Sequence, residues 1–238
     1  MALPDLRAHA QPYGIALSDG QLAQFGAYAR LLDVWSDRAN LVSDATIDTV
    51  ERRHFVESIA FGAALREREL LRPDSTVIDV GSGAGFPGVV LKIVWPGIAL
   101  TLLEATAKKT AFLSALVEEL DIGDIRVLTG RAEDYGHEPG LRGSFDLVVA
   151  RAVAPLPVLL ELTLPFARVG GRVAAVKGSR AAEELTASRR ALDVLGARAV
   201  MMPLRVPGPA QQIIVAVKQR LTAEAYPRRA GMPKKQPL

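Results

Sequence analysis

The spacing of hydrophobic residues changes once along this chain, after Arg72-Pro73-Asp74. From Ser18 to about Leu71, apolar residues recur at helical intervals, and Ser18 with Gln21 forms the pattern of a helix capping box. Beyond this point short apolar runs alternate with amphipathic stretches. The runs predict strands near 76–80, 99–104, 125–129, 145–150 and 171–177, and the stretches predict helices near 87–95, 107–121, 156–167 and 180–195.

Alternating strands and helices are typical of an α/β fold, in which helices cover both faces of a mostly parallel sheet. Two further strands, Ala197 to Val206 and Gln211 to Val217, are separated only by a short segment containing Pro207-Gly-Pro209. Because no helix lies between them, we expect an antiparallel hairpin at the edge of the sheet. This predicts three parts, which are an N-terminal helical region (1–72), a sheet domain (73–220) and a C-terminal tail (221–238).

Composition narrows the class of protein. Of the 238 residues 49% are hydrophobic but only 5% are aromatic, so Leu, Val and Ala must fill a large core. The absence of cysteine excludes disulfides, thiolate metal sites and a cysteine nucleophile, and we expect no metal. No run of about 18 apolar residues and no signal-peptide pattern occurs, which favours a cytoplasmic protein without a membrane partner.

Positive charge is concentrated in the C-terminal tail. Residues 225–238 hold four basic side chains and no acid, so the charge of this segment exceeds the net charge of +3 of the whole chain. Three prolines and a glycine in this stretch predict an extended arm and not a helix. Such an arm suits RNA phosphates, although a solvated terminus that only aids solubility fits the composition equally well.

The segment Asp79-Val-Gly-Ser-Gly-Ala-Gly-Phe-Pro-Gly88 carries the clearest functional signal. It follows the predicted strand 76–80 and precedes a predicted helix. Gly81, Gly83 and Gly85 would let the backbone turn sharply and approach a ligand closely. The pattern therefore predicts a loop that binds a nucleotide cofactor.

The glycines alone leave two cofactors open. Residues 83–88 also satisfy G-x-G-x-x-G, the dinucleotide fingerprint, and Glu104 follows at a distance that suits a ribose-binding acid. S-adenosylmethionine is favoured because Asp79 could serve its cationic methionine end, where a pyrophosphate would prefer no anion. The later strand 145–150 also places Arg151 where open α/β sheets bind ligands, and no acid/base set for hydride transfer is evident. A dinucleotide-dependent oxidoreductase is the alternative.

Motifs along nearly the whole chain match one known family. They are Trp35 to Asn40-Leu41, Arg53-His54 to Ser58, the segment 79–88, Leu103-Glu104, Lys108-Lys109, Phe112-Leu113, Arg131-Ala-Glu133, Phe145-Asp146 through Arg151-Ala152, Lys177-Gly178 and the Pro-Arg-Arg-Ala-Gly tail. With these motifs the chain resembles the bacterial small-subunit ribosomal RNA guanine-N7 methyltransferases, also called glucose-inhibited division protein B.

The resemblance implies a Rossmann-like class I methyltransferase whose 73–220 domain binds S-adenosylmethionine. It implies methylation of guanine N7 in the decoding-centre (530) loop of 16S ribosomal RNA. The partner would be this RNA or the small ribosomal subunit, and we expect a monomer. A protein that binds the RNA without transferring a methyl group is a second alternative.

The resemblance also implies roles for residues at the strand ends. Glu104 would accept hydrogen bonds from the ribose hydroxyls, while Ala132 and Glu133 would border the adenine. Because the ends of consecutive parallel strands line one crevice, Glu104 and Glu133 are expected there from the pattern too, although Glu133 could instead only stabilise a helix N-terminus. The expected cofactor-binding residues are Asp79, Gly81, Gly83, Gly85, Phe86, Glu104, Ala132, Glu133 and Arg151.

Chemistry is consistent with N7 as the acceptor. Methylation of pyrimidine C5 usually needs a cysteine, and exocyclic amines commonly need an Asn/Asp-Pro-Pro-aromatic loop where this chain has Arg151-Ala-Val-Ala-Pro155. Guanine N7 has a free lone pair, so alignment suffices and no general base is required. Arg151 is the one catalytic residue predicted, because its planar fork could orient either the guanine or the methionine carboxylate.

Basic side chains outside the cofactor loop are expected to contact RNA phosphates. Lys177 and Arg180 would meet a phosphate at a helix start. His54 could contact an RNA phosphate, cap the cofactor cleft, or belong to a helical ion-pair network at the surface. The predicted RNA-binding residues are Arg52, Arg53, His54, Lys177, Arg180, Arg228, Arg229, Lys234 and Lys235.

Overall fold

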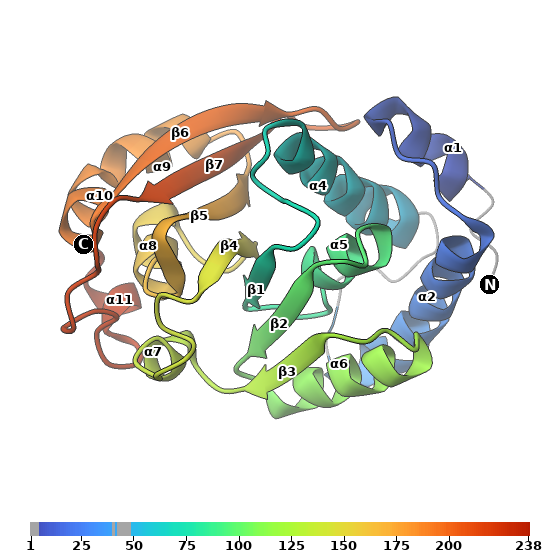
Figure 1. The fold of residues 1–238 in the computed structure, drawn as a ribbon, viewed down its shortest axis with the longest axis horizontal. Helices are drawn as coiled ribbons and strands as arrows, with labels where there is room; N and C mark the ends of the chain where they lie inside the picture. The colour runs from blue at the N-terminus through green and yellow to red at the C-terminus, as the bar shows by residue number, and fades with distance from the viewer. Residues whose placement is uncertain (1–4, 40, 42–48) are drawn as a thin grey trace.

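The protein forms a seven-stranded sheet with helices on both faces (Figure 1). The computed structural model describes residues 5–39, 41 and 49–238, and Asn40 of the family motif lies outside them. The strands are β1 (Thr76–Val80), β2 (Ala99–Glu104), β3 (Ile125–Thr129), β4 (Phe145–Arg151), β5 (Ala167–Lys177), β6 (Ala197–Leu204) and β7 (Gln211–Lys218). Their order is β3-β2-β1-β4-β5-β7-β6, and β7 runs antiparallel to both neighbours in an otherwise parallel sheet. The predicted parallel sheet with its C-terminal hairpin is confirmed.

The helices divide between the two faces of the sheet. They are α1 (Leu6–Ala10), the 3-10 helix η1 (Gln11–Tyr13), α2 (Asp19–Ala39), the π-helix η2 (Val50–Val56), α4 (Glu57–Glu67), α5 (Gly88–Val94), α6 (Ala107–Glu119), α7 (Ala132–Tyr135), α8 (Leu156–Thr163), α9 (Ala181–Ala187), α10 (Arg189–Leu195) and α11 (Met232–Lys235). Figure 1 shows α2, α4, α5 and α6 on one side of the sheet and α8, α9 and α10 on the other. Within the described residues, none of these helices has the length and hydrophobicity to cross a membrane.

Side chains of successive strand residues enter two separate hydrophobic cores. Val77 of β1 packs with the N-terminal helices, α5 and α6, whereas Ile78 packs with α8 and α10. The same alternation occurs in β4, where Val149 and Val148 face opposite cores. This period of two is what a strand covered on both faces requires.

The N-terminal helices share the first core with the sheet. The capping box predicted for α2 is present, because the Ser18 N–H donates to Oε1 of Gln21 at 3.0 Å and the Gln21 N–H donates to Oγ of Ser18 at 3.2 Å. Trp35 of α2 meets Phe112 of α6 edge to face, with ring centroids 6.0 Å apart. The described helices within residues 1–72 bury their apolar faces against the sheet. That residues 1–72 form a region separate from the sheet domain stays a prediction.

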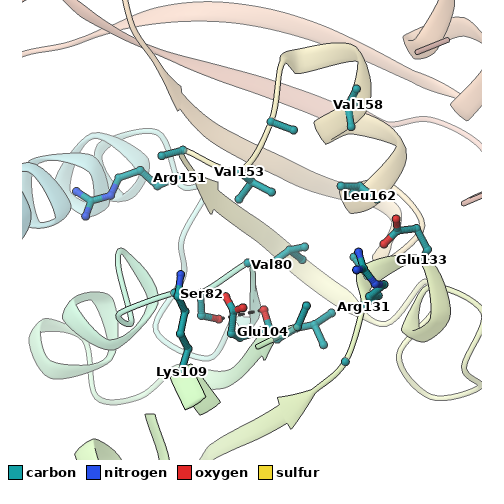
Figure 2. A pocket seen from close by; sticks show the side chains of 18 of the residues that line it. Val80, Ser82, Glu104, Lys109, Arg131, Glu133, Arg151, Val153, Val158 and Leu162 are labelled. Atoms are coloured by element: carbon teal, nitrogen blue, oxygen red, sulfur yellow. Dashed lines mark hydrogen bonds between the residues drawn. The ribbon is translucent and has the colours of Figure 1, made fainter. Parts of the chain in front are cut away.

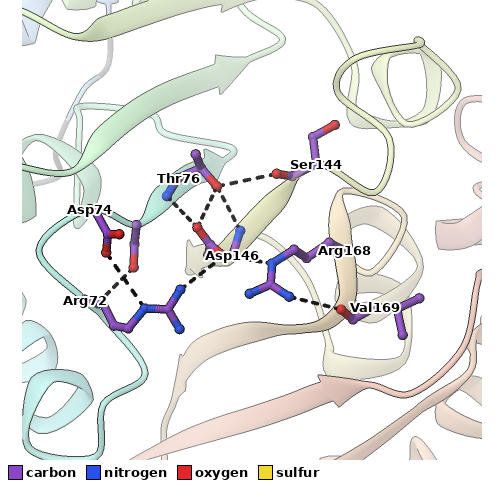
Figure 3. Close-up of polar contacts among 8 residues, drawn as sticks. Arg72, Asp74, Thr76, Ser144, Asp146, Arg168 and Val169 are labelled. Atoms are coloured by element: carbon purple, nitrogen blue, oxygen red, sulfur yellow. Dashed lines mark hydrogen bonds and ion pairs between the residues drawn. The ribbon is translucent and has the colours of Figure 1, made fainter.

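A polar network joins three strands at the N-terminal edge of the sheet (Figure 3). Asp146 of β4 accepts hydrogen bonds from the N–H and hydroxyl of Thr76 in β1, at 2.9 and 3.0 Å. The same carboxylate pairs with Arg168 of β5 at 2.8 Å and with Arg72 at 3.6 Å. This edge lies opposite the C-terminal strand ends, so the network stabilises the sheet away from any ligand site.

One predicted helix, 180–195, is divided in two at Ser188. Helix α9 ends there and α10 begins there, and the buried Ser188 hydroxyl donates to the carbonyl of Glu184 at 2.7 Å. A serine that hydrogen-bonds the backbone offers an alternative to the helical ladder. Both short helices contribute residues to the second core, Ala181 from α9 and Leu192 from α10.

The tail is not the extended arm that its prolines predicted. Met232–Lys235 forms α11, and buried Pro233 stands in its first turn, where a missing amide costs nothing. His137 contacts the carbonyl of Pro227 through Nε2 at 2.7 Å. The Arg142 guanidinium donates, at 2.7 to 3.0 Å, to the carbonyls of Gly136, Thr222, Ala223 and Tyr226. The tail therefore packs on α7 and α8.

Candidate active site

The loop after β1 contains two glycines whose side-chain space is already filled. Gly81 has φ +72°, and a Cβ there would lie 2.8 Å from a methyl group of Val153. Gly85 has φ +92°, and its Cβ would lie 2.6 Å from the hydroxyl of Tyr28. That hydroxyl, from α2, donates to the carbonyl of Ala84. Both positions require glycine, but Gly85, predicted to contact the cofactor, serves packing against α2 and does not line the cavity described below.

Asp79 lies beneath this loop and is fully buried. Its Oδ2 accepts a hydrogen bond from the Gly88 N–H at 2.8 Å, where α5 begins, and Oδ1 has no partner among the described residues. Burial raises the pKa of Asp79 to about 7, although the hydrogen bond from Gly88 acts in the opposite direction. The sequence predicted that this carboxylate would serve the methionine end of the cofactor. Asp79 is absent from the cavity wall and holds the loop onto α5, so its role at the methionine end stays a prediction.

A cavity of about 810 Å³ opens at the C-terminal ends of β1 to β4 (Figure 2). This is the edge at which open α/β sheets bind ligands, and the volume suits a small molecule. No group of three or more His, Asp or Glu side chains that could hold a metal occurs in the described part of the chain. Of the predicted cofactor-binding residues, the cavity is lined by Gly81, Gly83, Phe86, Glu104, Ala132, Glu133 and Arg151.

Glu104 connects the glycine loop to the end of β2. Its Oε2 accepts a hydrogen bond from the Gly83 N–H at 3.0 Å, and its Oε1 accepts one from the Thr106 N–H at 2.8 Å. Each carboxylate oxygen can accept a second hydrogen bond. A fixed acceptor in a cavity wall suits the hydroxyl pair of a ribose, so this carboxylate fits a nucleoside cofactor.

Glu133 lies across the cavity from Arg151 (Figure 2). It stands in the first turn of α7, and its Oε1 accepts a hydrogen bond from the Gly231 N–H at 3.0 Å. Gly231, Pro233 and Lys234 line the same cavity. The C-terminal tail therefore forms part of the cavity wall, which the sequence did not predict.

Arg151 is mostly buried at the other end of the cavity. Its guanidinium carbon lies 5.0 Å from the centroid of the Phe86 ring, on which the imidazole of His54 also stacks at 4.8 Å. Nη2 lies 3.1 Å from Nδ1 of His54, and Nη1 lies 3.5 Å from Oε2 of Glu57. Burial lowers the pKa of Arg151, while the charge of Glu57 counteracts this effect. The sequence offered a place at the cofactor cleft for His54, but it did not predict that His54 and Glu57 contact this guanidinium.

A second cavity, of about 1020 Å³, adjoins the first. It extends between the start of α4, the end of β5 and the segment 207–210 of the C-terminal hairpin. The two cavities share part of their walls. The residues that line both are His54, Arg151, Ala152 and Val153.

Four of the predicted RNA-binding residues, Arg52, Arg53, His54 and Lys177, line the second cavity. The Lys177 ammonium is already paired, because it lies 2.9 Å from Oε2 of Glu184 and donates to a backbone carbonyl at 2.6 Å. Lys177 thus already has a carboxylate partner, and its contact with an RNA phosphate stays a prediction. Arg180 is exposed at the start of α9.

The basic residues of the tail are not equivalent. Arg228 is paired with Glu161, a fully buried carboxylate of α8, so it anchors the tail and is not free for RNA. Arg229, Lys234 and Lys235 are exposed. These three remain available for the predicted phosphate contacts.

Comparison with known proteins bears on this geometry. A family model described as rRNA small subunit methyltransferase G (GidB) matches residues 21–214. The chain belongs to this family. It is 39% identical to the Ribosomal RNA small subunit methyltransferase G of Acetivibrio thermocellus, over 96% of this chain and 93% of that protein. Identity to the same-named protein of Roseiflexus sp. (strain RS-1) is 39% over 96% of this chain and 97% of that one.

A solved structure with a similar fold is the O-methyltransferase from Bacillus cereus in complex with SAH. It matches with a TM-score of 0.56 and 17% identity, over 82% of this chain and 91% of that chain. The predicted Rossmann-like class I methyltransferase fold is thus confirmed. Family membership also excludes the dinucleotide-dependent oxidoreductase that the glycine pattern had left open.

Proposed function

We propose that this protein transfers a methyl group from S-adenosylmethionine to N7 of a guanine in the decoding-centre (530) loop of 16S ribosomal RNA. The observation that carries the proposal is the shared wall of the two cavities. A cofactor in the first cavity and a base in the second would meet at His54, Arg151, Ala152 and Val153. Methyl transfer requires this contact between donor and acceptor.

The first cavity supplies the groups that the cofactor needs. Glu104 would accept hydrogen bonds from the ribose, and Ala132 with Glu133 would border the adenine at the end closed by the tail. Gly81 and Phe86 would line the methionine side, near Arg151. Asp79 and Gly85 act indirectly, because they shape the loop from beneath.

The reaction needs no proton acceptor. When bound, the cofactor would supply an electrophilic methyl carbon to the N7 lone pair, and the electrons of its carbon–sulfur bond would remain on sulfur. The positive charge moves to the guanine ring. The residues of the shared wall would therefore align the two reactants and exclude water, which are the contributions that lower the barrier here.

The RNA must present its guanine outside a regular helix. N7 lies on the major-groove edge, which is deep and narrow in A-form RNA, so the target should lie in a loop or be turned out of the stack. Arg52 and Arg53 at the second cavity and Arg229, Lys234 and Lys235 at the tail would contact phosphates. We further propose that the protein acts as a cytoplasmic monomer on the RNA or on the small subunit.

The function is tested by methyl transfer to mapped positions. Labelled S-adenosylmethionine, the protein and unmodified small ribosomal subunits are incubated, and the labelled nucleoside is identified and located. Label at guanine N7 in the decoding-centre loop is expected. The rate of methyl transfer should not depend on the titration of a catalytic base near neutral pH. Label on an exocyclic amine, a ribose or a protein side chain contradicts the proposal. Binding of subunits without transfer would support the non-catalytic alternative.

A further inference from the structure

The described wall of the second cavity combines several basic side chains with a single carboxylate. Among the described residues that line it, Glu57 at the start of α4 is the only carboxylate, and its side chain is 17% exposed. Much of the remaining wall is apolar, with Leu159, Val176 and Pro207 as examples. This carboxylate is partly buried and ion-paired with Arg151 in a wall that also holds Arg52 and Arg53, so it offers a ligand a charged hydrogen-bond acceptor.

The carboxylate is held in position from both sides. Its Oε1 accepts a hydrogen bond from the Gln211 amide at 2.9 Å, and its Oε2 lies 3.5 Å from Nη1 of Arg151. Gln211 begins β7, directly after the segment 207–210 that borders the cavity. Since an oxygen can accept two hydrogen bonds and the contact with Arg151 is long, Glu57 keeps capacity for a ligand.

The chemistry of N7 transfer restricts how guanine can be recognised. Arginine commonly reads guanine through O6 and N7 together, but a donor on N7 would occupy the lone pair that must attack the methyl group. Recognition must then come from the Watson–Crick edge, as for other bases that are turned out into a pocket. Guanine presents two donors on that edge, N1–H and the N2 amine, which match the two oxygens of a carboxylate. Adenine presents an acceptor at N1 and would be repelled.

We propose that Glu57 is the residue that selects guanine, by accepting hydrogen bonds from N1–H and the N2 amine of the base in the second cavity. This inference rests on the proposed function. Arg151 and Gln211 act as positioning residues that orient the carboxylate. The negative charge of Glu57 also balances the positive charge that the guanine ring acquires on N7 methylation, in a cavity wall that Arg52, Arg53 and Arg151 already make basic.

The test uses small subunits reconstituted with 16S ribosomal RNA that carries guanosine, inosine or 7-deazaguanosine at the target position. Inosine keeps N7 and N1–H but lacks the N2 amine, whereas 7-deazaguanosine lacks only the acceptor nitrogen. The wild-type protein should methylate inosine with kcat/KM roughly 10- to 100-fold below guanosine, because one carboxylate oxygen loses its donor. It should not methylate 7-deazaguanosine. This substrate tests the proposed transfer to N7 independently of the role of Glu57.

The variant Glu57→Gln should reduce the guanosine-to-inosine ratio of kcat/KM by roughly tenfold, since an amide no longer matches two donors. Binding of S-adenosylmethionine, measured by calorimetry, should stay within about twofold because Glu57 does not line the first cavity. Glu183→Gln, the same change at an exposed position of α9, should leave the ratio and the cofactor affinity at wild-type values.

Two results would overturn the assignment of Glu57 while N7 transfer stands. One is equal methylation of inosine and guanosine by the wild-type protein, which needs no variant and is independent of folding. The other is a wild-type ratio in Glu57→Gln. A loss of cofactor affinity in that variant would show a merely structural role. Methylation of the 7-deazaguanosine substrate would reject the proposed function and the selection of guanine with it.

Discussion

Arg228 donates three hydrogen bonds to the carboxylate of Glu161. Its Nε and Nη2 donate to the two carboxylate oxygens at 2.8 and 2.6 Å, and its main-chain N–H donates at 2.9 Å. Glu161 is fully buried in α8, whereas Arg228 lies at the surface of the tail. The pair fixes the C-terminal segment on the domain, since an unpaired carboxylate at this depth would be strongly unfavourable.

Replacement of Arg228 by alanine should lower the free energy of unfolding by roughly 3 kcal/mol, because it leaves the buried charge of Glu161 without its partner. Urea denaturation measures this difference. The neighbouring Arg229→Ala removes an exposed guanidinium and should change stability by less than about 0.5 kcal/mol. Equal stability of the two variants would mean that the ion pair does not anchor the tail.

Removal of residues 232–238 should weaken binding of S-adenosylmethionine by roughly tenfold, because Pro233 and Lys234 form part of the first cavity. The truncation keeps the contact of Gly231 with Glu133 and the side-chain pair of Arg228 with Glu161. Calorimetry of the truncated and full chains measures the change. The matched variant Lys235→Ala, outside the cavity wall, should bind like the wild type, and full affinity after truncation would remove the tail from the site.

Glu104→Gln should weaken cofactor binding by roughly tenfold, or about 1.4 kcal/mol, since it replaces charge-assisted hydrogen bonds to the ribose by neutral ones. It also weakens the bond that orders the loop at Gly83. Isothermal calorimetry with S-adenosylmethionine measures the effect, and Glu138→Gln at an exposed site provides the same chemical change. Wild-type affinity in Glu104→Gln would show that the ribose is bound elsewhere.

Arg151→Lys should reduce kcat/KM by roughly 100-fold, because an ammonium cannot contact Glu57 and His54 at once as the planar fork does. Steady-state kinetics with small subunits measure the loss. The same exchange at exposed Arg126 of β3 serves as control and should leave the rate unchanged. Retention of activity in Arg151→Lys would reduce its role to a point charge.

Stability should depend on Asp146 at neutral pH and not at low pH. Burial alone would raise the pKa of Asp146, but hydrogen bonds from Thr76 and Arg168, with the charge of Arg168, lower it overall (Figure 3). A carboxyl group with a lowered folded pKa stabilises the fold above its unfolded pKa, and this contribution is lost as pH falls through the folded value. The difference between wild type and Asp146→Asn, measured by denaturation, should be full above about pH 4 and vanish in stronger acid. A difference that is constant with pH would contradict this.

The sequence was sufficient for the sheet because its signals are local. Strand β1 and the capping box of α2 follow from apolar spacing and from residues three positions apart, and both appear as predicted. The division of the helix 180–195 was missed because it depends on one side chain, Ser188, that bonds the backbone. A pattern of hydrophobicity contains no information about that choice.

The position of Glu104 follows from a strand end, whereas the positions of Asp79 and Glu57 follow from tertiary contacts. Glu104 lies in the cavity because β2 ends there. Asp79 precedes it by one strand, yet the loop folds over it and turns its carboxylate toward Gly88. The pairing of Glu57 with Gln211 joins residues far apart in the chain, and neither the family motif from Arg53 to Ser58 nor the basic residues before Glu57 indicated it.

Tyr28 links helix α2 directly to the glycine loop. Its hydroxyl holds the carbonyl of Ala84 and its ring stacks on Phe86, at 5.2 Å between centroids. A ligand that binds only the folded loop stabilises the folded protein by mass action, by about 2.7 kcal/mol at a hundred times its Kd. Helix α2 lies outside the cavity wall but contacts the loop, so it shares that stabilisation. Saturating cofactor should therefore restore stability that is lost through destabilising substitutions in α2.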